Sequence, residues 1–203
     1  MLSGITPCDD AEVAARRAAL DADAMNVHVA AQRKALGCPE SWTVASFNAA
    51  RWPEMAACLA SSEKRNILAA APTNTGKSHA MCALALKHAA ENRPDGFKTT
   101  VFRLREHAFY PLWDQNRYRE SGDFREIVRQ AIAATVLVYD DLGKVEITRG
   151  NGLALTPFGC VVFDIFDCRA EQRKINLVTT RYASQKQLQD VVGDDLIRRV
   201  LQW

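Results

Sequence analysis

The amino-acid sequence predicts a three-layer α/β/α domain built around a parallel β-sheet. From residue 66 onward, short apolar runs alternate with segments whose apolar residues recur at helical spacing. Apolar runs of this kind are typical of parallel strands that helices cover on both faces. The first run leads directly into "APTNTGKS" (71–78), in which a lysine and a serine open a helical segment. In an open parallel sheet, ligands bind at this carboxyl edge of the strands.

The elements are predicted in the following order. An alanine-rich stretch, 9–36, has apolar residues on a loose helical period and predicts one or two helices that end at Gly37 and Pro39. Strands are predicted at 66–71, 99–105, 135–141 and 175–180, and further helices at 48–61, 77–91, 106–119, 122–133, 156–171, 184–191 and 194–202. The chain is therefore expected to consist of a helical N-terminal segment, 1–40, and an α/β core, 41–203.

The composition is that of a globular protein with one domain of ordinary size. The chain has 203 residues, of which 48% are hydrophobic and 25% charged, and its net charge of +2 does not by itself indicate nucleic-acid binding. No apolar run approaches the ~20 residues that span a bilayer, and the first residues lack the pattern of a secretory signal. The six cysteines form no C-x-x-C pair, which disfavours a zinc site or a disulfide framework. We therefore expect a cytoplasmic protein with reduced thiols and no membrane contact.

The stretch 71–78 matches the phosphate-binding pattern G-x-x-x-x-G-K-[ST] except at its first position, where Ala71 replaces glycine. Gly76 lets the backbone turn so that successive N–H groups point at phosphate oxygens, and the following helix adds its positive N-terminal end. Ala71 adds one methyl group at the loop entrance, which the loop tolerates. An ordinary helix start is the alternative interpretation, but the strand, loop and helix together favour a nucleoside triphosphate. The predicted ATP-binding residues are Pro72, Thr73, Asn74, Thr75, Gly76, Lys77, Ser78 and His79.

Individual side chains of this loop have predicted roles. Lys77 reaches the β- and γ-phosphates, and the hydroxyl of Ser78 ligates Mg²⁺. Asn74 stands where a second glycine is common, and asparagine is the residue other than glycine that best tolerates left-handed backbone. The cofactors expected from the loop are therefore ATP and Mg²⁺.

Two carboxylates, Asp140 and Asp141, lie at the end of the predicted strand 135–141. The carboxyl end of this strand is on the same edge of the sheet as the phosphate loop. One carboxylate there can hold Mg²⁺ through water, and the other can orient or deprotonate an attacking water. Taken alone, the pair is equally typical of a solvated turn at a strand end. Together with the loop, the pair predicts a nucleotide site in which one carboxylate serves the metal and the other serves the attacking water.

Four segments, "APTNTGKSHAM", "VLVYDDLGK", "INLVTTRY" and "DDLIRRVL", occur in an order that is similar to one family. Over roughly residues 42 to 203, the chain resembles the DnaC-type helicase loaders and IstB-type transposition helper ATPases, which are AAA+ proteins of the DnaA clade. The resemblance implies a P-loop NTPase core in which the strand 175–180 lies between 66–71 and 135–141. It also implies an ATPase, slow in isolation, that assists DNA replication by loading a replicative helicase onto single-stranded DNA.

The resemblance also implies roles for particular residues. It places Lys77, Ser78 and Asp140 at the nucleotide and its metal, and Asp141 at the catalytic acid position. It places Thr180 at the end of the sensor strand, followed by Arg181 where family members usually carry asparagine. Arg199 matches the family's arginine finger, with Arg198 as the alternative. The family continues into a fifth strand and a small C-terminal lid, which this sequence lacks, so we expect a monomer alone and an oligomer only with nucleotide or a partner.

In proteins of the DnaA clade, the helices between the second and third strands line a face that tracks single-stranded DNA. Here this region contains aromatic and basic residues, which base stacking and phosphate neutralisation both require. The predicted residues for weak binding of single-stranded DNA are Tyr110, Trp113, Arg117 and Arg119. Packing of the two aromatic residues into the core is the alternative. Helicase loaders place their partner-binding segment where residues 9–36 lie, although an alanine-rich helix also fits plain packing.

Three other interpretations of the phosphate loop remain open from the sequence. A transposition helper usually carries an E-x-x-x-R stretch near its N-terminus, which we do not find here. A small P-loop kinase needs an arginine-rich lid, and the stretch 142–156 has only Lys144 and Arg149 as basic residues. A non-hydrolysing interaction module is favoured by Ala71, Arg181 and the absent C-terminal lid. Measuring ATP hydrolysis with and without single-stranded DNA would separate these classes.

Overall fold

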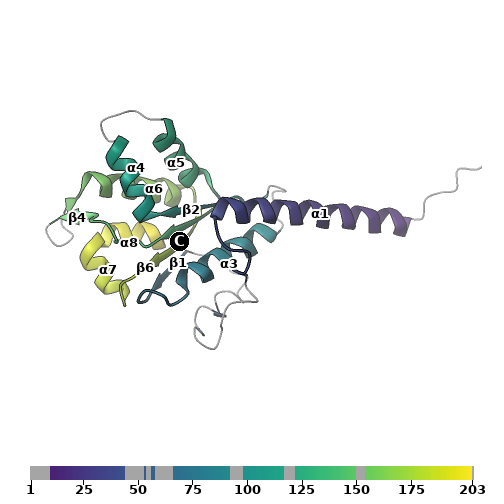
Figure 1. Cartoon of the computed structure of the whole chain (residues 1–203), viewed down its shortest axis with the longest axis horizontal. Helices are drawn as coiled ribbons and strands as arrows, with labels where there is room; N and C mark the ends of the chain where they lie inside the picture. Colours follow the sequence, from purple (N-terminus) through teal and green to yellow (C-terminus); the bar gives the residue numbers. More distant parts are fainter. Residues whose placement is uncertain are drawn as a thin grey trace, which may run out of the picture.

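Among the described residues, the central sheet is parallel and has four strands (Figure 1). The computed structural model describes residues 10–43, 53, 56, 57, 66–91, 98–116, 122–149 and 154–202. The strands are β1 (Ile67–Ala70), β2 (Val101–Arg105), β3 (Val136–Asp140) and β6 (Ile175–Thr180). Their order is β1-β6-β3-β2, so β6 separates β1 from β3, as the family resemblance implies. The predicted three-layer α/β/α fold is confirmed.

Two apolar clusters lie on opposite faces of this sheet. On one face, α3 (Lys77–Ala90) packs against side chains such as Val136 and Val138 of β3. On the other face, Leu137 and Tyr139 of the same strand join a second cluster. The helices of this second layer are α4 (Glu106–Asn116), α5 (Gly122–Ala133), α6 (Pro157–Glu171), α7 (Gln185–Val192) and α8 (Asp194–Leu201). Because alternate residues of a strand point to opposite faces, an apolar run without alternation is buried on both.

The N-terminal stretch forms one helix, α1 (Asp10–Leu36), rather than two. Its C-terminal part contacts α3 and β2, and Leu36 is buried in the α3 cluster. The rest of the helix projects far from the domain (Figure 1), and Val13, Leu20 and Val27 are 49%, 69% and 72% exposed. Among the described residues, no helix is both long enough and apolar enough to cross a membrane.

A short antiparallel hairpin, β4 (Thr148–Arg149) with β5 (Ala154–Leu155), precedes α6 and was not predicted from the sequence. Two residues per strand are too few to produce a periodic pattern. Gly159 lies close to this hairpin, and a Cβ atom built on it would stand 2.0 Å from the carbonyl oxygen of Ile147. The predicted helix 48–61 lies outside the described residues, apart from residues 53, 56 and 57, which are helical.

Candidate functional site

The phosphate loop has the backbone conformation that its sequence predicts. It connects the end of β1 at Ala70 to the start of α3 at Lys77. Gly76 has a φ angle of 83° and Asn74 one of 62°, so both lie in the left-handed region. The expectation that Asn74 adopts this conformation in place of a glycine is confirmed. Such a loop directs N–H groups toward one point in front of the helix.

Lys77 folds back across its own loop. Its Nζ donates to the carbonyl oxygens of Ala71 and Pro72 at 2.7 and 2.6 Å, and lies 3.3 Å from Thr75 Oγ1. Burial lowers the pKa of Lys77, and the nearby carboxylates of Asp141 and Asp140 oppose that effect. Neutral carbonyl oxygens are weaker acceptors for an ammonium group than the charged oxygens of a phosphate. The lysine is therefore placed to exchange these contacts for a phosphate.

Asp140 is the centre of the site, because donors from three different elements converge on its carboxylate. Ser78 Oγ, at the start of α3, lies 2.6 Å from Oδ1, and Thr179 Oγ1 of β6 lies 2.7 Å from the same oxygen. Arg103 of β2 donates to Oδ2 at 2.5 Å. Burial raises the pKa of Asp140, but these three donors outweigh it and hold the pKa below the ordinary value. The carboxylate is therefore ionised although it is almost fully buried.

Asp141 occupies the turn that follows β3 and has a φ angle of 68°. Its backbone N–H donates to Thr179 Oγ1 at 3.0 Å, and its carboxylate lies 3.6 Å from Lys144 Nζ. The side chain of Asp141 is 31% exposed, compared with 6% for Asp140. The two carboxylates therefore differ in environment: one is enclosed by donors, and the other reaches solvent.

The hydroxyl group beside these aspartates belongs to Thr179 and not to Thr180. Thr180 is fully buried, and its hydroxyl donates to the carbonyl oxygen of Leu142 at 2.8 Å. Neighbouring residues of a strand point to opposite faces, so only one of the two threonines can face Asp140. The structure thus corrects the sequence-based placement of Thr180 at the site, and assigns it to holding the turn after β3.

Sequence analysis missed Glu106, the first residue of α4. This carboxylate is fully buried and accepts hydrogen bonds from Tyr139 Oη at 3.0 Å and from the N–H groups of Gly143 and Val145 at 3.1 and 2.7 Å. Burial raises the pKa of Glu106 to about 7, against the opposing effect of these hydrogen bonds. The residue holds the turn that contains Asp141. An acidic residue directly after a strand was the available signal, because it lies on the same sheet edge.

His79, the last residue of the predicted nucleotide-binding set, contacts the segment that follows α1. Its ring stacks on Trp42 with centroids 5.5 Å apart and an interplanar angle of 14°. Its Nε2 lies 3.2 Å from the carbonyl oxygen of Thr43. The beginning of α3 is thus in direct contact with the connection between the N-terminal helix and the core.

Of the predicted DNA-binding residues, the structure describes Tyr110 and Trp113, and neither is fully exposed. Trp113 is 8% exposed and packs against Phe158 in the core, so in this structure its ring is not free to stack on a base. Tyr110 is half-buried, with its ring edge-on to Phe158. Burial of Trp113 corrects the sequence-based expectation, since the aromatic residue serves the packing of α4. Arg117 and Arg119 lie outside the described residues.

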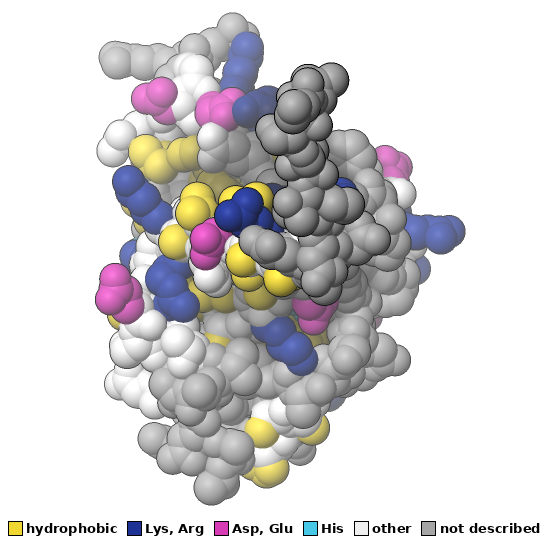
Figure 2. Space-filling model, turned by 90° about the vertical axis from the view of Figure 1, so that its right-hand side faces the viewer, with side chains coloured by type: hydrophobic (Ala, Val, Ile, Leu, Met, Phe, Trp, Pro, Cys, Tyr) yellow, Lys and Arg dark blue, Asp and Glu magenta, His cyan; other side chains and the backbone are white. Residues whose placement is uncertain are grey.

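Basic and acidic side chains are interspersed on the face seen from the free end of α1 (Figure 2). Among the described residues on this face, Lys and Arg side chains do not gather into one continuous patch. This agrees with the small net charge of +2.

Arg199 lies at the edge of the sheet opposite to the phosphate loop. Asn176, near the amino end of β6, donates from its side chain to the carbonyl oxygen of Val200, the residue after Arg199. Asn66, directly before β1, donates in the same way to the carbonyl oxygen of Gln202. The guanidinium group of Arg199 pairs with Asp167 of α6, with Nε 2.8 Å from Oδ1. The loop and Asp140 are at the carboxyl ends of the strands, so Arg199 does not belong to the site of its own chain.

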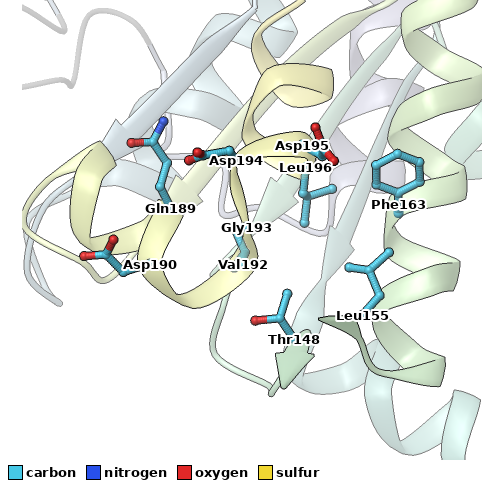
Figure 3. A pocket seen from close by; sticks show the side chains of 10 residues that line it. All are labelled: Thr148, Leu155, Phe163, Gln189, Asp190, Val192, Gly193, Asp194, Asp195 and Leu196. Atoms are coloured by element: carbon cyan, nitrogen blue, oxygen red, sulfur yellow. The ribbon is translucent and has the colours of Figure 1, made fainter. Parts of the chain in front are cut away.

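A cavity of about 510 Å³ lies at the junction of α7 and α8, beside the β4–β5 hairpin (Figure 3). Its lining includes the carboxylates of Asp190, Asp194 and Asp195 together with the apolar side chains of Leu155 and Phe163. Three carboxylates repel phosphate groups. None of the loop residues lines this cavity, so it does not belong to the nucleotide site.

The oxygen atoms around Asp140 fit a Mg²⁺ ion. Hydroxyl and carboxylate oxygens are the ligands that this cation takes in proteins, together with water and phosphate oxygens. Ser78 Oγ and Asp140 Oδ1 already lie 2.6 Å apart. Within the described ranges, no group of three or more His, Cys, Asp or Glu side chains could hold a metal ion by itself.

The fold is similar to that of solved DnaA structures. AMPPCP-bound DnaA from Aquifex aeolicus matches with a TM-score of 0.57 and 18% sequence identity, covering 80% of this chain and 48% of that chain. Domain III of the Thermotoga maritima replication initiation protein DnaA gives a TM-score of 0.54 and 17% identity, covering 81% and 65%. Replication initiator DnaA bound to AMPPCP and single-stranded DNA gives a TM-score of 0.54 and 18% identity, and the match covers 80% of this chain and 48% of that chain.

At this low identity, the likeness shows the fold alone, which is that of the matched part of these DnaA structures. The chain spans less than two thirds of the length of these DnaA chains. No family model matches the sequence, and no curated protein matches it either.

Proposed function

We propose that this chain is an AAA+ ATPase that binds ATP and Mg²⁺ at the carboxyl edge of its sheet and hydrolyses ATP slowly. The observation that carries the proposal is the meeting of Ser78 and Asp140, whose oxygens lie 2.6 Å apart directly behind a phosphate loop. The loop supplies N–H groups and a lysine, and β3 supplies the carboxylates. The AMPPCP-bound DnaA structures have the same fold and support a nucleotide as the ligand.

The residues of the chain have distinct roles in the proposed reaction. Lys77 leaves the carbonyl oxygens of its loop and pairs with the β- and γ-phosphates. Mg²⁺, when bound next to Ser78 and Asp140, neutralises charge on the phosphates. Asp141, the more exposed carboxylate, orients a water molecule and accepts its proton. The turn that carries Asp141 is held by Thr179 and Glu106.

The biological setting that we propose is DNA replication, with the chain helping to load a replicative helicase onto single-stranded DNA. The similarity of the fold to DnaA supports a replication protein, and one of those structures contains single-stranded DNA. We propose that residues 1–40 form a segment that contacts the partner. The projecting part of α1, with its three exposed apolar side chains, is consistent with this role.

Two substitutions test the nucleotide site. Lys77→Ala is expected to abolish ATP binding, because the lysine and the loop act on the same phosphates. Asp141→Asn is expected to preserve binding and to block turnover, because it keeps the shape of the side chain and removes the base. Binding is measured with a fluorescent ATP analogue and turnover by phosphate release, each with and without single-stranded DNA.

Lys87→Ala is the matched control, because it removes the same charge from the other end of α3. ATP binding by Lys77→Ala at the strength of this control would refute the site. Turnover by Asp141→Asn at the parental rate would refute only the role of the second carboxylate.

A further inference from the structure

Arg103 forms an ion pair with the carboxylate at the centre of the proposed site. Its Nη2 lies 2.5 Å from Asp140 Oδ2, and the two side chains are only 8% and 6% exposed. The register of the sheet explains the contact: Arg103 of β2 is paired with Val138, so its long side chain needs to reach only two residues along β3. A strand arginine thereby holds the carboxylate that the metal would use.

The other surroundings of Arg103 leave Asp140 as its counter-charge. Its guanidinium carbon lies 5.5 Å from the ring centroid of Trp42. The thiol of the adjacent Cys82 stays neutral, because burial raises its pKa to about 12 although Arg103 opposes this effect. Arg103 Nε is buried and has no hydrogen-bond acceptor among the described residues. The arginine is therefore tied to one carboxylate and one aromatic ring.

We propose that Arg103 and Mg²⁺ compete for Asp140, so that Arg103 sets how strongly nucleotide binding depends on the metal. The inference rests on the proposed ATP site and adds its regulation by a residue of this chain. Oδ1 already accepts from Ser78 and Thr179, and Oδ2 accepts from Arg103. A cation that approaches this carboxylate must either displace the guanidinium group or lie beside its positive charge.

Both routes reduce the increase in ATP affinity that Mg²⁺ can provide. Displacing Arg103 leaves a buried cation without its counter-charge, and breaking one side of a buried pair is costly. Leaving Arg103 in place puts two positive groups on one carboxylate. Without metal, Arg103 neutralises Asp140, so the carboxylate does not repel the incoming phosphates. The parent protein therefore binds ATP almost equally well with and without Mg²⁺.

The experiment compares the affinity for mant-ATP in Mg²⁺ and in EDTA, for the parent and for Arg103→Met and Arg103→Gln. For the parent, we expect the two affinities to agree within about threefold. For both variants, we expect binding in EDTA to be weaker than in Mg²⁺ by about tenfold or more, the effect of losing one charge-assisted hydrogen bond. Arg105→Met is the control, because it removes a positive charge from the same strand. Arg105 is exposed, and its guanidinium group donates to the carbonyl oxygen of Gly37 and not to Asp140.

The ratio of the two affinities separates this proposal from a structural role, since partial unfolding lowers both affinities together. Variants whose ratio equals that of the parent would refute the competition. A parent that binds mant-ATP about a hundredfold more weakly in EDTA would refute it without any variant. If the parent binds mant-ATP in neither buffer, the proposed nucleotide site itself is wrong, and the competition with it.

Discussion

Replacement of Glu106 by glutamine is expected to change how the stability of the protein depends on pH. The carboxylate is fully buried between α4 and the turn after β3, and burial raises its pKa from 4.5 to about 7. In the unfolded chain, the carboxyl group is exposed and titrates near 4.5. Between these two values, the folded protein holds a proton that the unfolded chain has released.

The sign of the effect follows from this difference in bound protons. Between pH 4.5 and 7 the folded state binds more protons than the unfolded state. The contribution of Glu106 to stability is therefore fully present below pH 4.5 and is lost as the pH rises through 7. A difference of about 2.5 pKa units corresponds to about 3 kcal/mol at most. The amide of the Glu106→Gln variant cannot titrate, so this pH dependence of stability disappears from the variant. The amide can also change the stability through its contact with Gly143, but that change is the same at every pH.

The assay is urea denaturation of the parent and of Glu106→Gln, monitored by circular dichroism from pH 5 to pH 8.5. The other titrating groups are common to both proteins and cancel in the difference between their free energies of unfolding. We expect the parent to lose about 2 to 3 kcal/mol relative to the variant over this range. A difference that stays constant within about 0.5 kcal/mol would refute the reasoning, because that is the limit within which independent effects add.

Glu126→Gln provides the matched control for this measurement. Glu126 is an exposed glutamate of α5, and hydrogen bonds from Arg129 and Gln130 lower its pKa to about 2. Its titration is therefore complete well below pH 5 in the folded state and about three-quarters complete at pH 5 in the unfolded state. The stability difference between the parent and this variant should barely change between pH 5 and pH 8.5.

Two further predictions concern assembly and packing. Because Arg199 lies away from its own loop, we expect Arg199→Ala and Lys77→Ala chains each to be inactive alone. A mixture of the two should regain ATP hydrolysis under conditions where the parent assembles, because an intact arginine of one chain can then meet an intact loop of another. If the mixture releases no more phosphate than the single variants, Arg199 does not act as a finger on a neighbouring chain. Gly159→Ala should destabilise the fold by about 1–3 kcal/mol in urea denaturation, because its Cβ would meet Ile147 O. Gly122→Ala, with nothing within 4 Å of the added carbon, should have no such effect, and equal stability of the two variants would contradict the packing argument.

Much of the fold could be predicted from the sequence, because the signals are local. The strands β1, β2, β3 and β6 are short apolar runs, and burial on both faces requires such runs irrespective of their neighbours. The phosphate loop is also local, since Asn74 and Gly76 carry their left-handed conformations in their own chemistry. The strand order came from the family resemblance and not from the composition of any one strand. The hairpin β4–β5 was missed because two residues per strand give no period.

Other features were decided only by tertiary structure, because they depend on which side chains meet across the sheet. Thr179 and Thr180 are identical in sequence terms, and the orientation of β6 alone puts the first beside Asp140. Trp113 has the chemistry of a stacking residue, but α4 turns it into the core.

Arg103 and Glu106 appear in the sequence as ordinary charges of an alternating segment. Their partners, Asp140 and the turn after it, are more than thirty residues away along the chain. A parallel sheet brings such residues together because the strand next to β2 in space is β3, and the carboxyl ends of both strands lie at the same edge. The sequence by itself therefore determined the presence of a phosphate loop and of its acidic strand end, and the pairing of strands determined which charges surround them.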